Sequence, residues 1–186
     1  MLFFECKRVY LLMVYAVLTG DIVASSTLDA SRLDAILTTL RAASVEIGNW
    51  APGPATGFAR RGGDGWQVAL DQPALALRAA LYLRARLLRE DDKASTRIAI
   101  ATGDGSLPPN GDLNAAHGPA FTASGRALDH IPTHATMIHA AGGAMAATTF
   151  LADHIAAGWT QAQARALCEM LPPDSGTRGA AAERLG

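Results

Sequence analysis

The sequence predicts an α/β fold of the ferredoxin-like type, in which helices cover one face of a sheet, followed by a C-terminal helical appendage. Strand-like apolar runs and segments of helical spacing alternate in the order strand, helix, strand, strand, helix, strand, helix, strand. With 186 residues, the chain is long enough for one medium-sized domain with a buried core. From about Gly143 onward the pattern is only helical, which predicts the appendage.

The individual elements are separated by turn signals, above all Gly, Pro, Asn and Asp. Ser26 or Thr27 is expected to cap the first helix, and Pro73 suits the first position of the second. The segment from Gly103 to His117 is expected to be a long loop. The expected strands cover 13–18, 57–59, 67–70, 97–101 and 135–139, and the expected helices cover 28–47, 73–89, 118–128, 144–156, 160–171 and 178–185.

The N-terminal end needs a separate interpretation. Residues 1–12 are interpreted as an N-terminal arm or as an extension from an upstream start. The apolar run 9–18 follows two basic residues and would suit a signal peptide, but it is too short for an ordinary membrane span, and 19–21 is a poor cleavage site. We therefore favour a buried strand, a sheet domain at 13–142 and a helical segment at 143–186.

Charge and cysteine content exclude several classes of protein. The formal net charge is −1 at pH 7, so the chain as a whole has no attraction for nucleic acid or acidic lipid. The two cysteines, Cys6 and Cys168, lie far apart without metal-binding spacing, which argues against a disulfide framework and suits a reducing compartment. We therefore expect a cytoplasmic protein that does not act at a membrane.

The most informative stretch is Arg60–Trp66, which places two arginines, three glycines and Asp64 between two strand-like runs. This pattern predicts a hairpin with a carboxylate at its tip. Gly62 and Gly63 let the backbone turn and approach a ligand closely, and Arg60 and Arg61 supply donors for an anion. The carboxylate can hold a metal ion. The alternative is an ordinary turn without a ligand.

A second carboxylate, Asp21, lies at the end of the first strand. It would lie beside Asp64 if their strands are neighbours in the sheet. Two such carboxylates can bind two divalent ions, which neutralise the charge of a triphosphate. The turn after Asp21 would add backbone N–H groups that bind phosphate. The alternative interpretation is two unconnected turn aspartates.

Three motifs, in this order and within residues 14–140, resemble those of class III nucleotidyl cyclases. The motifs are Asp21-Ile22-Val23-Ala24-Ser25-Ser26, Arg60-Arg61-Gly62-Gly63-Asp64-Gly65 and Gly118-Pro119-Ala120-Phe121-Thr122-Ala123-Ser124-Gly125-Arg126. The resemblance implies a cyclase-type sheet, a purine nucleotide as ligand, and two Mg²⁺ or Mn²⁺ ions held by Asp21 and Asp64. It also implies a homodimer, because Arg126 falls on an arginine that completes the neighbouring subunit's site and stabilises the transferring phosphoryl group.

The same resemblance implies nucleotide contacts from the two turns and shows where this chain departs from the family. The implied contacts come from Ile22, Val23, Ala24, Ser25, Arg60, Gly62 and Gly63. Thr122 stands where an asparagine usually orients the ribose, Arg60 where a base-selecting lysine is common, and Ala115 where its partner carboxylate is often found. Nucleotide binding in a regulatory protein is therefore easier to support than fast cyclisation. An active adenylate or guanylate cyclase is the alternative.

Two further resemblances concern the whole chain and the hairpin. The chain as a whole resembles the SatD family, in which a cyclase-like domain precedes a helix-turn-helix segment, and residues 159–164 and 177–186 resemble its first two helices. Without a recognition helix, DNA binding is expected only in a longer form, and a DNA-binding or interaction module without nucleotide chemistry is a further alternative. Residues 60–64 also resemble the GGDEF-type diguanylate cyclases, but Gly65 replaces an acidic residue of that motif.

Overall fold

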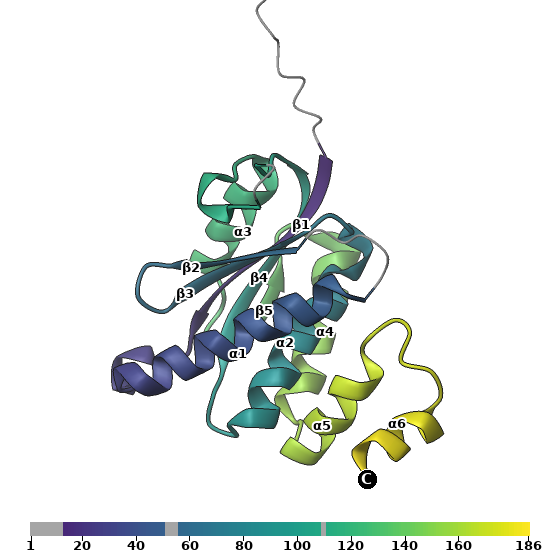
Figure 1. The fold of residues 1–186 in the computed structure, drawn as a ribbon. Helices are drawn as coiled ribbons and strands as arrows, with labels where there is room; N and C mark the ends of the chain where they lie inside the picture. Colours follow the sequence, from purple (N-terminus) through teal and green to yellow (C-terminus); the bar gives the residue numbers. More distant parts are fainter. Residues whose placement is uncertain (1–12, 51–55, 109–110) are drawn as a thin grey trace, which may run out of the picture.

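The computed structural model describes residues 13–50, 56–108 and 111–186, and it has a five-stranded sheet with helices on both faces (Figure 1). The strand order is β2-β3-β1-β4-β5. All neighbouring strands pair antiparallel except β4 and β5, which are parallel. The strands are β1 (Met13–Ile22), β2 (Thr56–Arg61), β3 (Gly65–Leu70), β4 (Thr96–Gly105) and β5 (Met137–His139). The predicted α/β fold and its element order are confirmed, while the arm expected at 1–12 lies outside the described residues.

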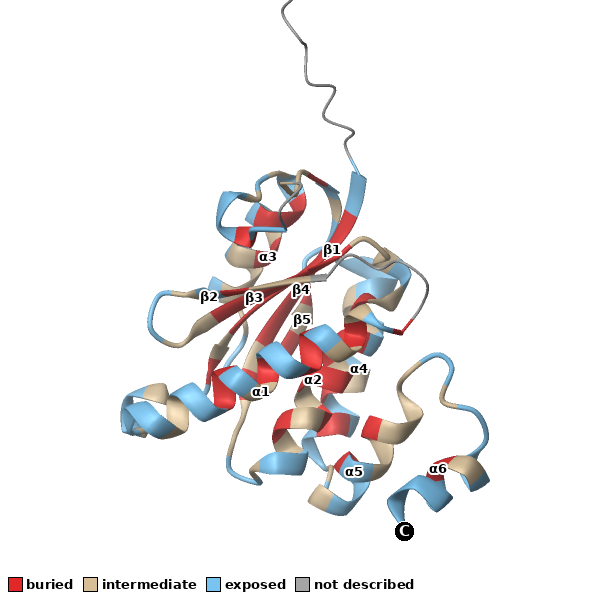
Figure 2. Cartoon of the chain, viewed as in Figure 1, coloured by how far each residue is buried: buried red, intermediate tan, exposed pale blue. Residues whose placement is uncertain are grey.

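Helices cover the sheet unequally on its two faces. The larger core contains α1 (Ala30–Gly48) and α2 (Ala76–Glu90), whereas α3 (Pro119–Asp129) covers the second face, which the sequence pattern did not predict (Figure 1). The alternation of β1 explains both layers, because Ala16 and Leu18 belong to the larger core and Tyr15 and Val17 to the smaller one. The central strands are therefore buried on both sides (Figure 2).

Two local predictions were wrong. Asp29 caps α1, since its side chain accepts a hydrogen bond from the Arg32 amide, while Ser25–Thr27 form a separate 3-10 turn, η1. The expected loop from Gly103 is partly regular, because β4 continues to Gly105 and a short 3-10 helix, η3 (Leu113–Ala115), follows. Another 3-10 turn, η2 (Pro73–Leu75), precedes α2. Each of these 3-10 turns is only three residues long, a length at which propensity is a weak guide.

Of the C-terminal helices, α4 (Gly143–Ala157) and α5 (Gln161–Met170) pack onto the sheet domain, and α6 (Arg178–Leu185) packs on α5. Cys168 of α5 is buried in the larger core, and this burial raises the pKa of its thiol to about 11. Arg78 of α2 donates to the Leu171 carbonyl oxygen at 3.0 Å. The segment therefore shares the main core instead of having one of its own.

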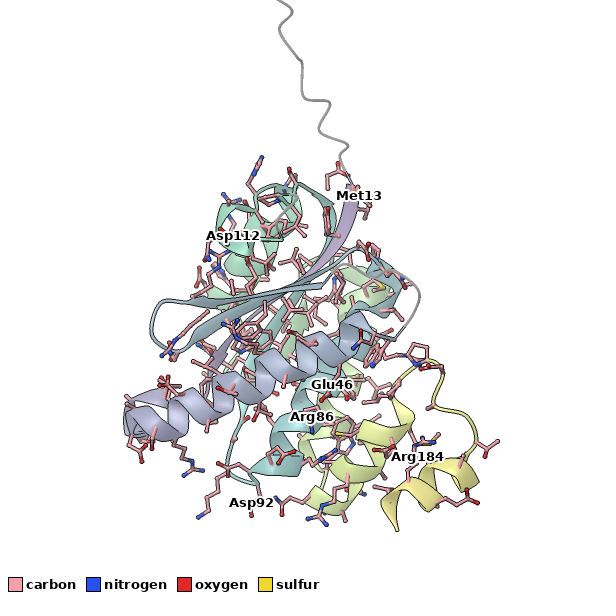
Figure 3. All side chains as sticks on the ribbon, viewed as in Figure 1. Met13, Glu46, Arg86, Asp92, Asp112 and Arg184 are labelled. Atoms are coloured by element: carbon pink, nitrogen blue, oxygen red, sulfur yellow. The ribbon has the colours of Figure 1, made fainter. Side chains whose placement is uncertain are left out.

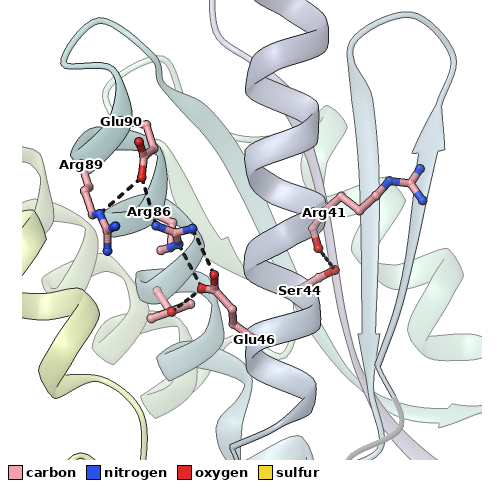
Figure 4. A network of polar contacts seen from close by, with 7 residues as sticks. Arg41, Ser44, Glu46, Arg86, Arg89 and Glu90 are labelled. Atoms are coloured by element: carbon pink, nitrogen blue, oxygen red, sulfur yellow. Dashed lines mark hydrogen bonds and ion pairs between the residues drawn. The ribbon is translucent and has the colours of Figure 1, made fainter.

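Ion pairs between helices fix the arrangement of the larger layer. Glu46 of α1 and Arg86 of α2 point toward one another (Figure 3), and Arg86 also pairs with Glu90 in its own helix (Figure 4). Tyr82 donates to Glu46 at 2.5 Å, and burial together with this carboxylate raises the pKa of Tyr82. Across the described residues, no helix combines the length and the apolar character needed to cross a bilayer.

Candidate nucleotide site

The two predicted carboxylates come together at one end of the sheet. β1 and β3 are neighbours, and Asp21 pairs in register with Gly65, the residue that follows Asp64. Asp64 lies in the three-residue turn between β2 and β3 and is half-buried. The strand pairing therefore supplies the spatial link between the two motifs that the sequence alone left open.

Trp66 fixes the end of β1 from the opposite face. Its buried ring packs against Gly20, where a Cβ would lie 2.4 Å from both the Trp66 ring and the Arg97 carbonyl oxygen. The indole Nε1 donates to Thr96 Oγ1 at 2.9 Å, and this hydroxyl donates to the Asp21 carbonyl oxygen at 2.6 Å. Only glycine fits at position 20, and the backbone of Asp21 is held in place as a result.

Hydrogen bonds fix the turn after β1, and several of its donor groups already have partners. Ala24 has a left-handed backbone, with φ 55° and ψ 30°, and its carbonyl oxygen accepts from the Thr27 amide at 2.9 Å. The Val23 amide donates to the Ser95 carbonyl oxygen at 2.9 Å, and the Ser25 hydroxyl donates to Asp64 Oδ2. Ser25 therefore joins the two motifs directly.

Arg97 is the main site residue that sequence reasoning missed. It lies opposite Asp21 in the register of β1 and β4. Its Nε donates to Asp21 Oδ1 at 2.8 Å, and its Nη2 donates to Asp21 Oδ2, which makes a two-bond pair. The hydrogen bond to Asp21 raises the pKa of Arg97, and the nearby Asp64 and Asp129 add to this effect. No local pattern marks Arg97, because its role depends on strand register.

The donor chemistry of this end of the sheet fits a divalent cation. In residues 13–50, 56–108 and 111–186, no three His, Cys, Asp or Glu side chains are placed to hold a metal ion. Mg²⁺, however, is commonly held by one or two carboxylates, with water and substrate phosphates completing its shell. Asp21 and Asp64 can provide such a pair, and Arg97 is the group that competes for Asp21.

The two hairpin arginines point to opposite faces of the sheet. Arg60 lies on the α1 side, where it donates to the Gly63 carbonyl oxygen at 2.9 and 2.7 Å and pairs with Asp34 at 2.8 Å. Arg61 lies on the α3 side, where it donates to Gln67 and to the Leu113 carbonyl oxygen, each at 2.7 Å. Arg61, and not the predicted nucleotide contact Arg60, therefore shares the face of Asp21.

A chain of buried hydrogen bonds runs from Arg61 across that face to α3. Gln67 donates to Thr19 Oγ1 at 2.9 Å, and Thr19 and Ser124 hydroxyls lie 2.7 Å apart. Ser124 in turn donates to the Phe121 carbonyl oxygen at 3.0 Å. These bonds fix α3 relative to β1 and β3, the strands that border the carboxylate pair.

Thr122 and Arg126 lie on the other side of α3. Its inner face carries Ala120, Phe121 and Ser124, which are buried, whereas Thr122 and Arg126 are both exposed. Their spacing of four residues puts them on one face of the helix. The structure thus does not bring either side chain to the carboxylate pair of the same chain.

Solved structures of nucleotidyl cyclases resemble this chain in fold. No family model matches the chain, and no curated protein matches it either. A bacterial light-regulated adenylyl cyclase superposes with a TM-score of 0.51 at 16% identity, over 69% of this chain and 43% of that one. An adenylate/guanylate cyclase/hydrolase from Silicibacter pomeroyi gives 0.50 at 23% identity, over 68% and 74%. The chain has a nucleotidyl cyclase fold.

Proposed function

We propose that this chain is a regulatory protein that binds a purine nucleotide together with Mg²⁺, or Mn²⁺ in its place, at the end of β1 and the β2–β3 turn. The observation that carries the proposal is that Asp21 pairs in register with Gly65, the residue after Asp64, while Ser25 from the turn after β1 donates to Asp64. Carboxylates from two strand ends are donors that a Mg²⁺–nucleotide complex commonly uses. The cyclase fold supports a nucleotide as the ligand.

The two turns would surround the phosphates. A Cβ at Gly62 or Gly63 would meet no atom within 4 Å, so the hairpin backbone is open to an approaching anion. Ile22, Val23 and Ala24 would approach from the turn after β1. Arg60 lies on the α1 side of the sheet, away from Asp21, so it would contact the nucleotide only by leaving Asp34 and reaching around the hairpin. A bound cation would neutralise phosphate charge. The role of Asp21 and Asp64 is to hold and orient the complex.

Isothermal titration with ATP and with GTP, each with and without Mg²⁺, tests the proposal. We expect magnesium-dependent heat for one purine nucleotide, and its loss in Asp64→Ala, because half of the carboxylate pair is removed. Asp174→Ala, at an exposed position in the loop between α5 and α6, is the matched control and should bind as the wild type does. Absence of magnesium-dependent binding, or equal binding by Asp64→Ala, contradicts the proposal.

An active nucleotidyl cyclase is the second candidate, and the exposure of Thr122 and Arg126 favours it. On the outer face of α3 these side chains are free to meet a second copy of the chain, as a homodimer with shared sites requires. We expect a dimer on sedimentation and, in this case, cyclic nucleotide formed from ATP or GTP with Mn²⁺. A mixture of Asp64→Ala and Arg126→Ala protomers should regain activity, since one site of the mixed dimer is intact. A strictly monomeric protein contradicts this candidate.

The helices α5 and α6 support a regulatory coupling of the nucleotide site to a partial helix-turn-helix. Thr160 and Gln163 form a capping box at the start of α5, and Thr177 caps α6. We propose that α5 and α6 contribute to DNA binding only together with a recognition helix. A salt-dependent gel shift by a fusion that adds such a helix, but not by this chain, supports this assignment, and equal binding by both contradicts it.

A further inference from the structure

We propose that Arg97 is a built-in competitor of the divalent cation: its guanidinium bonds to both oxygens of Asp21, so a cation can chelate that carboxylate only when Arg97 is displaced. The inference rests on the proposed function for the location of the cation site, and it adds the residue that sets cation affinity there. Arg97 would thus set the cation affinity of this site, although none of the three sequence motifs contains it.

The geometry of the pair is the first support. Arg97 Nε lies 2.8 Å from Asp21 Oδ1, while Nη2 bonds to Oδ2, so the same two oxygens that would bind a cation are already used. A guanidinium matches a carboxylate with two parallel bonds, which gives this pairing a defined geometry. One acceptor site on each oxygen is therefore taken by the guanidinium, and a cation that chelates both oxygens has to displace Arg97.

The backbone around the pair is fixed, so displacement has to come from the side chain. Asp21 and Arg97 face each other in a register that extends over all of β1, and the neighbouring Thr96 donates to the Asp21 carbonyl oxygen. The side chains are 21% exposed for Asp21 and 43% exposed for Arg97. Arg97 can therefore swing into solvent without opening the sheet, and a partly exposed pair of this kind is weak enough to be displaced.

The charge around Arg97 is the second support. Besides Asp21, the carboxylates of Asp64 and Asp129 lie close enough to stabilise its charged form. Replacing Arg97 by a neutral residue would leave these carboxylates with one positive charge fewer. A divalent cation would then be attracted to the end of β1 by the same acidic groups that now hold the guanidinium.

Mn²⁺ binding to the full chain, without any nucleotide, tests this inference. Free Mn²⁺ is followed by the intensity of its electron paramagnetic resonance signal. We expect Arg97→Gln to bind Mn²⁺ at least about tenfold more tightly than the wild type, and the double variant Asp21→Asn/Arg97→Gln to lose this gain. Unchanged Mn²⁺ affinity in folded Arg97→Gln, or a gain that survives Asp21→Asn, overturns the inference.

Arg184→Gln is the matched control, because Arg184 pairs with Glu169 at 2.6 Å. The side chains of Arg184 and Glu169 are 44% and 25% exposed, close to the values for Arg97 and Asp21. The control variant should leave Mn²⁺ binding unchanged, and an equal gain there overturns the inference. Should Arg97→Gln fail to fold, Arg97→Lys keeps the charge but loses the two-bond fork, and we expect a smaller gain, whose absence also overturns it. A Mn²⁺ gain in a protein that binds no purine nucleotide would sustain this inference and refute the proposed function.

Discussion

Two arginine–aspartate pairs in this molecule show how burial separates a structural contact from an exchangeable one. Arg84 of α2 pairs with Asp153 of α4 at 2.5 Å, with side chains only 16% and 8% exposed. Thr136 completes this cluster, because its backbone amide and its hydroxyl both donate to Asp153. Arg97 and Asp21 form an equally close pair at the sheet end, but their side chains remain partly open to solvent.

The surroundings of the two pairs explain their different uses. At Asp153, two donor residues from separate segments bond to both oxygens of one buried carboxylate. At the sheet end, one guanidinium, that of Arg97, pairs with the partly exposed carboxylate of Asp21, and the carboxylates of Asp64 and Asp129 lie nearby. The Arg84–Asp153 pair, with Thr136, joins α2, α4 and the residue before β5. The Arg97–Asp21 pair can be broken at a small cost in free energy.

The largest effect is expected from breaking the buried pair. Asp153→Ala should lower the free energy of unfolding by about 3–5 kcal/mol, because it leaves the Arg84 charge and the Thr136 donors without their partner. Urea denaturation followed by circular dichroism measures this value. A loss under about 1 kcal/mol would show that the buried pair behaves like an exposed one and would remove the contrast.

A smaller loss is expected from Gly20→Ala, which acts on the exposed pair through its backbone. The new Cβ would lie 2.4 Å from the Trp66 ring and from the Arg97 carbonyl oxygen, so β1 and β4 have to shift. We expect a loss of roughly 1–3 kcal/mol in the free energy of unfolding, the usual range for overpacking. Gly63→Ala is the control, since its Cβ would meet nothing within 4 Å. Equal losses in both variants would contradict the explanation.

The pH dependence of stability should report on the buried Arg84–Asp153 pair. Burial alone would raise the pKa of Asp153, but the hydrogen bonds from Thr136 and the charge of Arg84 outweigh it and lower this pKa in the folded state. The associated stability is present above the unfolded value of about 3.9 and is lost as the pH falls through the lower folded value. We expect urea midpoints to fall across this acid range.

Asp153→Asn supplies the comparison for that measurement. Because it removes the titrating group, the variant should be less stable near neutral pH and show a shallower decline in acid. An acid decline as steep as that of the wild type would mean that other carboxylates account for it.

Periodicity and turn residues were sufficient to predict the order of the elements. The apolar run of β1 and the glycine turn after Arg61 have local signals, so strand and hairpin were identified. Which face a helix covers is not local, and the position of α3 on the second face therefore needed the structure. The cap at Asp29 was missed because Ser26 and Thr27, equally good capping residues, come first in the sequence.

The residues of the candidate site likewise fall into those with a local sequence signal and those without one. Asp21 and Asp64 could be proposed from the sequence because each ends a strand or forms a turn of recognisable composition. Arg97 and Trp66 could not, since their contacts with the end of β1 depend on the register of β4 and on the close approach at Gly20. An arginine in a strand carries no sequence signal that names its partner across the sheet.

The smallest change in the free energy of unfolding is expected for the Arg97–Asp21 pair, at the proposed cation site. Arg97→Gln should change the free energy of unfolding by less than about 1 kcal/mol, because a partly exposed pair is largely screened by solvent and Asp21 can be solvated in its place. Urea denaturation at low and at moderate salt measures this value. A loss as large as that of Asp153→Ala would make Arg97 a structural residue of the β1–β4 pairing. A small loss combined with tighter Mn²⁺ binding would instead mean that the guanidinium contributes little to folding and acts mainly on access to Asp21.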